Sequence, residues 1–280
     1  MDFGISTCSY REETLTTRCL DAIHNSGFRH IELFANRPHL DYRDRSRRRE
    51  LIDWFRAHPT GKPSLHLPFF ESTGRGSRRW ISALAPEERQ RQEARDEIKR
   101  ALEITDALQL SWVVVHLGVP GQPFSPLLFD YAYTVVDMIR SFAGVVILIE
   151  NLPNEISTPE RIMEFVRTAQ IPEIRICYDI GHGRLAGSSP RLEDAGAVHL
   201  NDNDGHTDQH LWPFAGVIDW ASFAGTLASS GFAHPLVFEG PDTNLEAARR
   251  AAARLEALAG EARSSREEFD RKYGLLTEKP

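Results

Sequence analysis

Cysteine is scarce in the 280-residue chain, and long apolar runs are missing. The three cysteines, Cys8, Cys19 and Cys177, have no paired spacing, which excludes a disulfide-stapled scaffold and favours a reducing compartment. The longest apolar runs, 112–115 and 145–149, are far shorter than the roughly 20 residues that cross a bilayer. The N-terminus lacks a basic stretch followed by an apolar one, so no secretory signal is expected. We therefore expect a soluble, cytoplasmic protein without a membrane partner.

Basic residues are also fewer than acidic ones. The sequence has 33 Lys and Arg and 40 Asp and Glu, which gives a formal net charge of -7. Such a chain has no general attraction for nucleic-acid backbones or anionic lipid, so any nucleic-acid binding would have to be local. Hydrophobic residues make up 41% of the sequence, which over this length can bury one large core. This composition excludes a disordered or collagen-like protein.

Short apolar or β-branched runs alternate with longer stretches that have helical spacing. The eight runs begin near Phe3, His30, Ser64, Trp112, Val145, Ile174, Ala197 and Leu236. The predicted helices span Glu13–Asn25, Asp44–Ala57, Pro86–Leu108, Pro126–Phe142, Thr158–Thr168, Asp219–Ser230 and Leu245–Ala262. The segment after the sixth run has the weakest helical signal. Runs such as 145–149 are apolar without alternation, which is typical of parallel strands covered on both faces.

Eight such units in a chain of this length predict an α/β fold, a (β/α)8 TIM barrel. We expect one domain over residues 1–262, followed by an extra C-terminal helix and tail over 263–280. An open doubly wound sheet is the alternative. It is disfavoured because Ser6–Tyr10 follows the first run, where a Gly-rich nucleotide fingerprint would stand.

Side chains with the chemistry of metal ligands follow the ends of the predicted strands. They are His66, His116, Glu150, Asp179, His182, His199, Asp208, His210 and Glu239. In a barrel of this kind the strand ends share one face, so these groups should meet there. A single histidine or carboxylate at a strand end is usually structural, but so many together would lose hydration unless cations compensated their charge. The pattern therefore predicts a divalent-metal site.

The mixture of ligands favours zinc, with manganese or cobalt as alternatives, because imidazole nitrogen is a poor ligand for magnesium. Two divalent ions would neutralise the four carboxylates of this set. Three ions would leave about two positive charges for an anionic substrate. The number of ions per chain, from one to three, stays open at this point. This number bears on which reaction the site would catalyse.

The sequence resembles the xylose isomerase-like TIM barrel superfamily, which contains sugar phosphate isomerases and epimerases as well as endonuclease IV-type apurinic-site endonucleases. The resemblance covers nearly the whole chain and is most specific at His199–Gly205, Asp208–Leu211 and Ile218–Trp220. For the isomerases and epimerases it implies a single-metal set with His182 nearby as a substrate contact. That set is Glu150, Asp179, His199 and Glu239. The full set of nine matches instead the ligand order of the three-zinc endonuclease IV site.

The sequence departs from endonuclease IV in the loop that carries two of these residues. The segment between His199 and Asp208 is shorter, and Phe214 and Ala215 interrupt the Gly-rich stretch that normally follows. These departures put the shape of that turn in question. No lysine stands on the rim of the sixth strand, as it would in xylose isomerase itself, which argues against that enzyme.

Our first hypothesis is a divalent-metal-dependent isomerase or epimerase of a sugar, sugar phosphate or similar polyhydroxy carbonyl compound, working through a metal-stabilised enediolate. Glu150 and Glu239 would act as base and acid on two faces of the substrate carbon, with His182 as a third catalytic group. A small carbohydrate or sugar phosphate would be the partner. The candidate substrate-binding residues are Glu32, Arg78, Arg79 and Trp212.

The alternative is an endonuclease IV-like trinuclear zinc phosphoester hydrolase, in which His66, His116, Asp208 and His210 complete the extra metal sites. Nucleic acid would be a partner only in this case. Two basic stretches, 42–49 and 75–80, could then contact a phosphate backbone. A metal-loaded barrel that only binds a ligand is a third interpretation. The sequence leaves the oligomeric state open.

Overall fold

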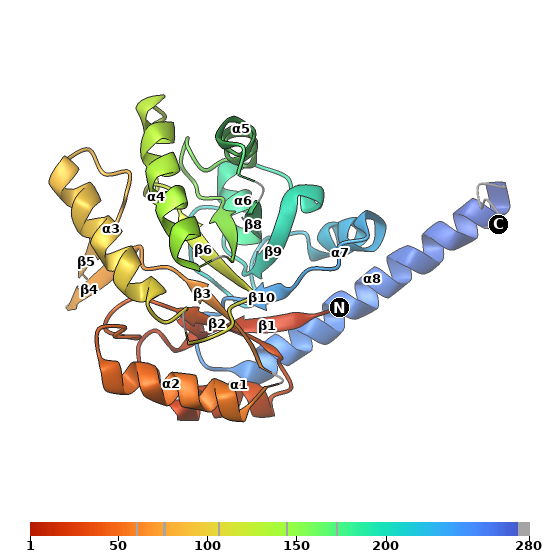
Figure 1. Cartoon of the computed structure of the whole chain (residues 1–280). Coiled ribbons are helices and arrows are strands. Elements are labelled where there is room, and N and C mark those ends of the chain that lie inside the picture. The colour runs from red at the N-terminus through yellow and green to blue at the C-terminus, as the bar shows by residue number, and fades with distance from the viewer. Residues whose placement is uncertain (60, 75–76, 106, 144, 172, 274–280) are drawn as a thin grey trace.

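Eight parallel strands close into a barrel in the computed structural model of the chain, which describes residues 1–59, 61–74, 77–105, 107–143, 145–171 and 173–273 (Figure 1). The barrel strands are β1 (Phe3–Ser6), β2 (His30–Phe34), β3 (Lys62–His66), β6 (Trp112–His116), β7 (Val146–Glu150), β8 (Ile174–Asp179), β9 (Ala195–Leu200) and β10 (Leu236–Phe238). Neighbours in sequence are neighbours in the barrel, and β10 pairs with β1 to close it. The predicted TIM barrel is therefore confirmed.

Helices follow the strands and cover the barrel from outside. They are α1 (Thr17–Asn25), α2 (Arg45–Ala57), α3 (Glu88–Leu102), α4 (Leu127–Ala143), α5 (Pro159–Ala169), α6 (Ile180–Ala186), α7 (Trp220–Ser230) and α8 (Leu245–Tyr273), with 3₁₀ turns at η1 (Thr7–Tyr10) and η2 (Leu192–Asp194). Helix α5 begins where its cap predicts, because the Thr158 hydroxyl accepts from Arg161 N and Pro159 occupies the first turn. Helix α1 begins later than predicted, since Leu15 N donates to His39 O and holds the preceding residues outside the helix.

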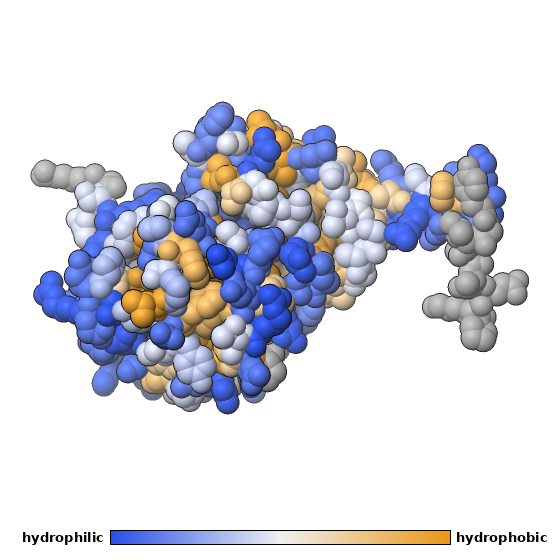
Figure 2. Space-filling view, turned by 90° about the horizontal axis from the view of Figure 1, so that it is seen from above, coloured by the Kyte–Doolittle hydropathy of each residue, from blue (hydrophilic) through white to orange (hydrophobic). Residues whose placement is uncertain are grey.

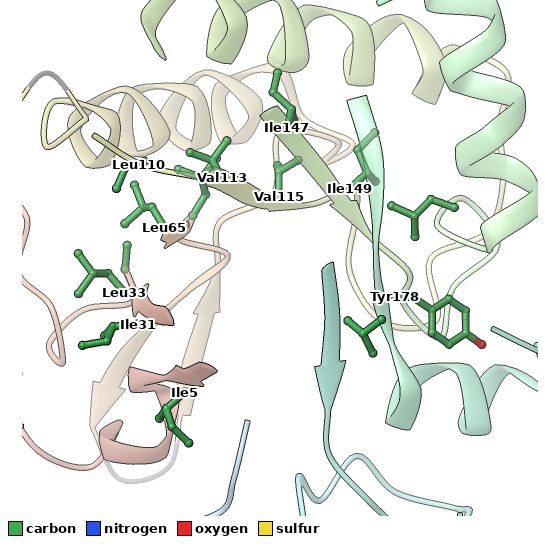
Figure 3. Close-up of a cluster of buried hydrophobic side chains, with 14 of the residues drawn as sticks. Ile5, Ile31, Leu33, Leu65, Leu110, Val113, Val115, Ile147, Ile149 and Tyr178 are labelled. Carbon is green, nitrogen blue, oxygen red and sulfur yellow. The ribbon is translucent and has the colours of Figure 1, made fainter. Parts of the chain in front are cut away.

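Alternation along the strands divides the barrel side chains into an outer and an inner set. Outward residues such as Val113, Val115, Ile147 and Ile149 pack in the main core with the helices (Figure 3). A separate inner cluster consists of Trp112, Val114, Leu148, Cys177, Ala197 and Val237. Two positions further along the same strands, or just past their ends, and on the same inner side, stand His116, Glu150, Asp179, His199 and Glu239. An apolar layer thus lies directly beneath a polar one.

An antiparallel hairpin after β3 was not predicted. It consists of β4 (Phe70–Gly74) and β5 (Ser77–Trp80). Directly paired residues share a face of such a ribbon, so Phe70 and Trp80 lie on one face and Glu71 and Arg79 on the other. In the sequence this segment is too short and too rich in charge to stand out as a pair of strands.

Helix α8 is one continuous helix of 29 residues, so residues 263–273 extend it and do not form a separate helix. Its first half packs against α7 through Ala248, Ala251, Leu255 and Ala259, while its second half projects from the barrel (Figure 1). The rest of the predicted tail, 274–280, lies outside the described residues.

Hydrophilic residues dominate the face of the molecule seen in Figure 2, and smaller apolar patches lie between them. Within the described ranges, none of the helices combines the length and the apolar character that a membrane span requires.

Candidate metal centre

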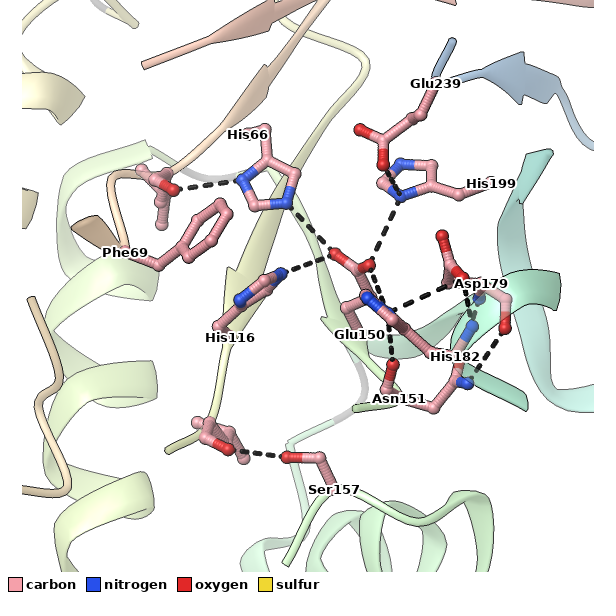
Figure 4. Close-up of polar contacts among 12 residues, drawn as sticks. His66, Phe69, His116, Glu150, Asn151, Ser157, Asp179, His182, His199 and Glu239 are labelled. Carbon is pink, nitrogen blue, oxygen red and sulfur yellow. Dashed lines mark hydrogen bonds and ion pairs between the residues drawn. The ribbon is translucent and has the colours of Figure 1, made fainter. Parts of the chain in front are cut away.

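The predicted ligand residues meet at the mouth of the barrel, in three groups whose ligand atoms lie within 4.8 Å of one another. The groups are His66, His116 and Glu150; His182, Asp208 and His210; and Glu150, Asp179, His199 and Glu239. Glu150 belongs to two of them, and His182 of the remaining group lies 3.1 Å from Glu150 Oε1, so the three groups are contiguous (Figure 4). Because the strand ends of a TIM barrel share one face, side chains that are far apart in the sequence lie close together here, as predicted.

Glu150 lies at the centre of the cluster and is 1% exposed. Its Oε2 atom is 3.0 Å from His66 Nε2 and 2.9 Å from His116 Nε2, and its Oε1 atom is 3.1 Å from His182 Nδ1 (Figure 4). Burial opposes ionisation of this carboxyl, but the imidazoles of His116 and His199 outweigh it and hold the pKa of Glu150 well below its usual range. Glu150 is therefore an anion that imidazoles surround.

Asp179 is fixed by two asparagines that sequence analysis did not single out. Asn151 Oδ1 accepts from Asp179 N at 2.7 Å, and Asn201 Nδ2 donates to Asp179 Oδ2 at 2.5 Å. Asp179 Oδ1 also accepts from His182 N at the start of α6. A Cβ on Gly181 would lie 1.8 Å from Asn201 Oδ1, so only glycine fits there. Burial raises the pKa of Asp179 to about 6.

His199 and Glu32 form the floor of the cluster. His199 is fully buried, and its Nε2 atom lies 3.1 Å from Glu32 Oε1. The sequence predicted Glu32 at a strand end in contact with substrate, but it stands in the middle of β2, fully buried, where Trp112 Nε1 lies 3.4 Å from its Oε2 atom. It does not line the cavity above the cluster. The geometry thus makes Glu32 a partner of His199.

The group of His182, Asp208 and His210 joins helix α6 to the loop after β9. Asp208 Oδ2 lies 3.3 Å from His182 Nε2, and Asp208 Oδ1 lies 3.3 Å from His210 Nε2. Burial opposes protonation of His210, but the Asp208 carboxylate outweighs it and raises the pKa of His210 to about 9. Burial likewise opposes protonation of His182, and Asp179 and Asp208 still raise its pKa well above the usual value. At His116, burial outweighs the effect of the Glu150 carboxylate and lowers the pKa to about 4.

Asp202 holds this loop in shape, although sequence analysis assigned it no role. Its buried carboxylate accepts five hydrogen bonds: from the backbone N–H groups of Asn203, Phe214, Gly216 and Ile218, and from Trp220 Nε1. The turn that the sequence left in question is resolved here, with Phe214 in the left-handed region at a φ of 74°. The position of Asp202 just after a predicted strand is the signal by which the sequence could have identified it.

A cavity of about 120 Å³ opens above the cluster. Ligand side chains form one part of its lining, and the others include Phe34, Phe69, Phe70 and Trp80 as an aromatic wall and Cys8, Arg11 and Arg78 near the rim. Sequence analysis missed Cys8 and Arg11, although both follow β1 at the same barrel mouth.

Besides Glu32, two more of the predicted substrate contacts do not reach this cavity. Arg79 lies on the outer face of the hairpin, where its Nη2 atom donates to Glu71 Oε2 at 2.7 Å. Trp212 is buried against Gly240, where an added Cβ would lie 2.2 Å from the ring, and its Nε1 atom donates to Asp242. Arg78 does line the cavity. Strand alternation explains why neighbouring arginines differ in this way.

The donor set fits one or more divalent cations. Among the buried atoms that make no hydrogen bond to any described residue, three belong to the candidate ligands and are not paired elsewhere in the floor of the cluster: His199 Nδ1, His210 Nδ1 and Glu239 Oε1. Buried polar atoms without partners are rare in proteins, and these three belong to groups with metal-ligand chemistry. Imidazole nitrogens with carboxylate oxygens suit zinc, manganese or cobalt.

Comparison with known proteins places these residues in a family. The family model described as xylose isomerase-like TIM barrel matches residues 20–260. The uncharacterised protein y4fM of Sinorhizobium fredii is 29% identical over 201 residues, which cover 62% of this chain and 64% of that protein. MJ1311 of Methanocaldococcus jannaschii, also uncharacterised, is 26% identical over 251 residues, or 83% of this chain and 81% of that protein. The chain thus spans less than two thirds of y4fM.

Solved structures with the same fold include a D-tagatose 3-epimerase-like protein, with a TM-score of 0.75 and 22% identity over 95% of this chain and 99% of that chain. The IolI protein with a binding zinc atom has a TM-score of 0.72 and 20% identity, with the same coverage. The TTHB071 protein from Thermus thermophilus, soaked with ZnCl2, has a TM-score of 0.70 and 24% identity over 93% and 99%. Likeness at these identities concerns the fold.

The histidine protonation states predict that zinc binding at the group of His182, Asp208 and His210 releases protons. A metal ligand must be neutral imidazole, whereas His182 and His210 carry protons at pH 7 because their pKa values are raised. We expect proton release at pH 7 and zinc affinity that weakens as the pH falls from 9 to 6. Calorimetric titrations in buffers of different ionisation enthalpy measure both. His210→Ala should release fewer protons, and a zinc affinity independent of pH over this range would contradict the assignment.

Loss of the Asp202 carboxylate should destabilise the loop that carries Asp208 and His210. Asp202→Ala leaves five donors without their acceptor, and we expect the free energy of unfolding to fall by about 3–5 kcal/mol. Urea unfolding measures this change. Asp204→Asn is the control, because that exposed carboxylate only caps its own turn. Equal midpoints for the two variants would rule out the proposed role of Asp202.

Proposed function

The chain belongs to the xylose isomerase-like TIM barrel family, and we propose that it is a divalent-metal-dependent isomerase or epimerase of a sugar, sugar phosphate or similar polyhydroxy carbonyl compound. The observation that carries this proposal is the buried group of Glu150, Asp179, His199 and Glu239 at the base of a small cavity. The likeness in fold to a D-tagatose 3-epimerase-like protein is consistent with it.

Glu150, Asp179, His199 and Glu239 would hold the catalytic ion. When bound, a divalent cation supplies Lewis-acid polarisation of adjacent substrate oxygens, which acidifies the neighbouring carbon-bound proton. The asparagines around Asp179 keep its carboxylate in one orientation, as the outer partners of a metal site do. Glu32 does the same for the His199 ring from below.

Glu150 and Glu239 would move the proton. They stand at the ends of β7 and β10, which are separated by β8 and β9, so they approach the cavity from different sides. Glu150 is ionised at neutral pH because its pKa is held low, which suits a base. Glu239 Oε1 has no hydrogen-bond partner among the described residues and can carry a proton on the other face of the substrate carbon. Inversion at that carbon needs such a pair.

His182 and the aromatic wall complete the catalytic surface. His182 lines the cavity between Glu150 and Asp208, and as an imidazolium it can donate a hydrogen bond to a substrate oxygen. Phe34, Phe69 and Phe70 cover the side of the cavity toward β2 and β3 with apolar surface. This surface excludes water from the exchanging proton and packs against the carbon skeleton of a sugar.

Removing either glutamate charge should abolish proton exchange. We expect Glu150→Gln and Glu239→Gln each to lower the rate by about 10²–10⁴, the usual contribution of a general acid or base. The assay is deuterium incorporation at carbon from D2O, followed by NMR over a panel of ketoses and ketose phosphates. Glu155→Gln, an exposed site five residues after Glu150, is the control. Full activity in either of the two variants contradicts the mechanism.

A second candidate is a phosphoester hydrolase of the endonuclease IV type, which two observations favour. Enediolate chemistry requires neither the group of His66, His116 and Glu150 nor the group of His182, Asp208 and His210. Both groups also lie next to the four residues that would hold the catalytic ion. Several close ions would suit activation of water and stabilisation of a leaving oxygen.

Metal content separates the two candidates. For the isomerase we expect one tightly held ion per chain after purification without added metal, with activity retained in His66→Ala and His210→Ala. Elemental analysis of the protein and of both variants measures this. About three zinc ions in the unaltered chain, loss of ions in both variants and hydrolysis of bis(p-nitrophenyl) phosphate would instead establish the hydrolase.

A further inference from the structure

The rim of the cavity carries two cationic side chains that the proton-transfer chemistry does not use. Arg11 and Arg78 both line the cavity, and neither forms an ion pair with any described residue. This is unlike Arg79, which is bound to Glu71, and Arg91, which is bound to Glu88. A guanidinium that faces a ligand cavity with its charge unpaired is available to an anionic group of the ligand.

Arg78 is directed to the cavity by the hairpin. It pairs with Ser72 across the ribbon and so shares the face of Phe70 and Trp80, both of which line the cavity. Its guanidinium carbon lies 4.7 Å from the centre of the Phe70 ring. Stacking on this ring restricts the guanidinium and leaves its N–H edge open. The opposite face of the hairpin is anchored, because Glu71 binds both Arg37 and Arg79.

Arg11 is held on the neighbouring part of the rim. Its Nη1 atom donates to Cys8 O at 3.2 Å and to Gly240 O at 3.1 Å, which fixes the side chain beside the end of β10. Both acceptors are neutral carbonyls, so they orient the guanidinium without compensating its charge. The remaining N–H groups have no acceptor among the described residues.

The cavity is therefore polarised. The carboxylates of the lining come from β7, the loop after β9 and the end of β10, whereas Arg78 and the aromatic wall come from β2 and the segment after β3, where the imidazoles of His66 and His116 contact the wall. Arg11 stands between these sides, near β1. A ligand that placed an anionic end among the carboxylates of the first side would be repelled by them. The same end reaches two unpaired cations if it points toward the hairpin.

We propose that Arg11 and Arg78 bind an anionic group at the distal end of the substrate, a phosphate monoester or a carboxylate, and so select an acidic sugar derivative over a neutral sugar. The proposal rests on the proposed function, which supplies the sugar and its orientation. Guanidinium groups suit this role because their paired N–H donors match two oxygens of a phosphate or carboxylate. The two arginines act on specificity and take no part in proton transfer.

Binding calorimetry on the metal-loaded full chain tests this with D-fructose, D-fructose 6-phosphate, D-glucuronate and inorganic phosphate. We expect at least one of the two acidic sugars to bind about tenfold or more tightly than D-fructose, and Arg78→Gln to remove most of that preference. Arg78 is exposed, so its replacement leaves the fold intact. Arg11→Gln should act in the same direction, with its melting temperature as a check on folding. The better acidic ligand identifies phosphate or carboxylate as the group.

Arg89→Gln is the matched control. It removes the same charge from helix α3, where Arg89 is 86% exposed beside Glu93 and does not line the cavity. This variant should keep the preference. Equal binding of neutral and acidic sugars, or a preference that survives in Arg78→Gln, would overturn the proposal; the second result would mean that the phosphate is held elsewhere in the site. Since binding is measured without turnover, failure here is distinct from failure of the isomerase assay.

Discussion

The charge balance around the buried carboxylate of Glu150 is the interaction on which the rest of the site depends. A carboxylate with 1% exposure has lost its hydration, and imidazoles from β3, β6, β9 and the start of α6 replace that water. Three of these imidazoles are held by a further group: His66 and His182 by backbone carbonyls, and His199 by Glu32. The site is a network in which acidic and basic groups compensate one another, and exchange of protons for cations preserves that balance.

The barrel can hold such a network because its two layers separate the tasks. Apolar residues such as Val114 and Leu148 fill the interior and close the barrel, and the ligands stand one pleat above them on the same strands. Polar groups are thereby concentrated at one end, where asparagines bind Asp179 and Asp202 holds the loop that carries Asp208 and His210. The residues of the candidate site and the apolar residues that stabilise the fold thus lie in adjacent layers of the same strands.

The two sides of the cavity carry different kinds of side chains. The glutamates to which we assign proton transfer stand on the side of β7–β10, and the hairpin of β4 and β5 brings an aromatic face with Arg78 over the opposite side. The hairpin is an insertion between β3 and α3 and is not needed to close the barrel. Elements of this kind can change the substrate while the barrel and its polar layer stay the same.

Local sequence by itself determined the barrel and the set of candidate ligand residues, because strand periodicity and strand-end positions are encoded by residues close together in the chain. Only the tertiary structure decided how these residues are used. Glu32 lies beneath His199, Arg79 faces away from the cavity, and Asp202 organises a loop through donors up to 18 residues away. Hairpin register, loop closure and the depth of a side chain below the rim arise from contacts between distant segments, which spacing along one strand does not specify.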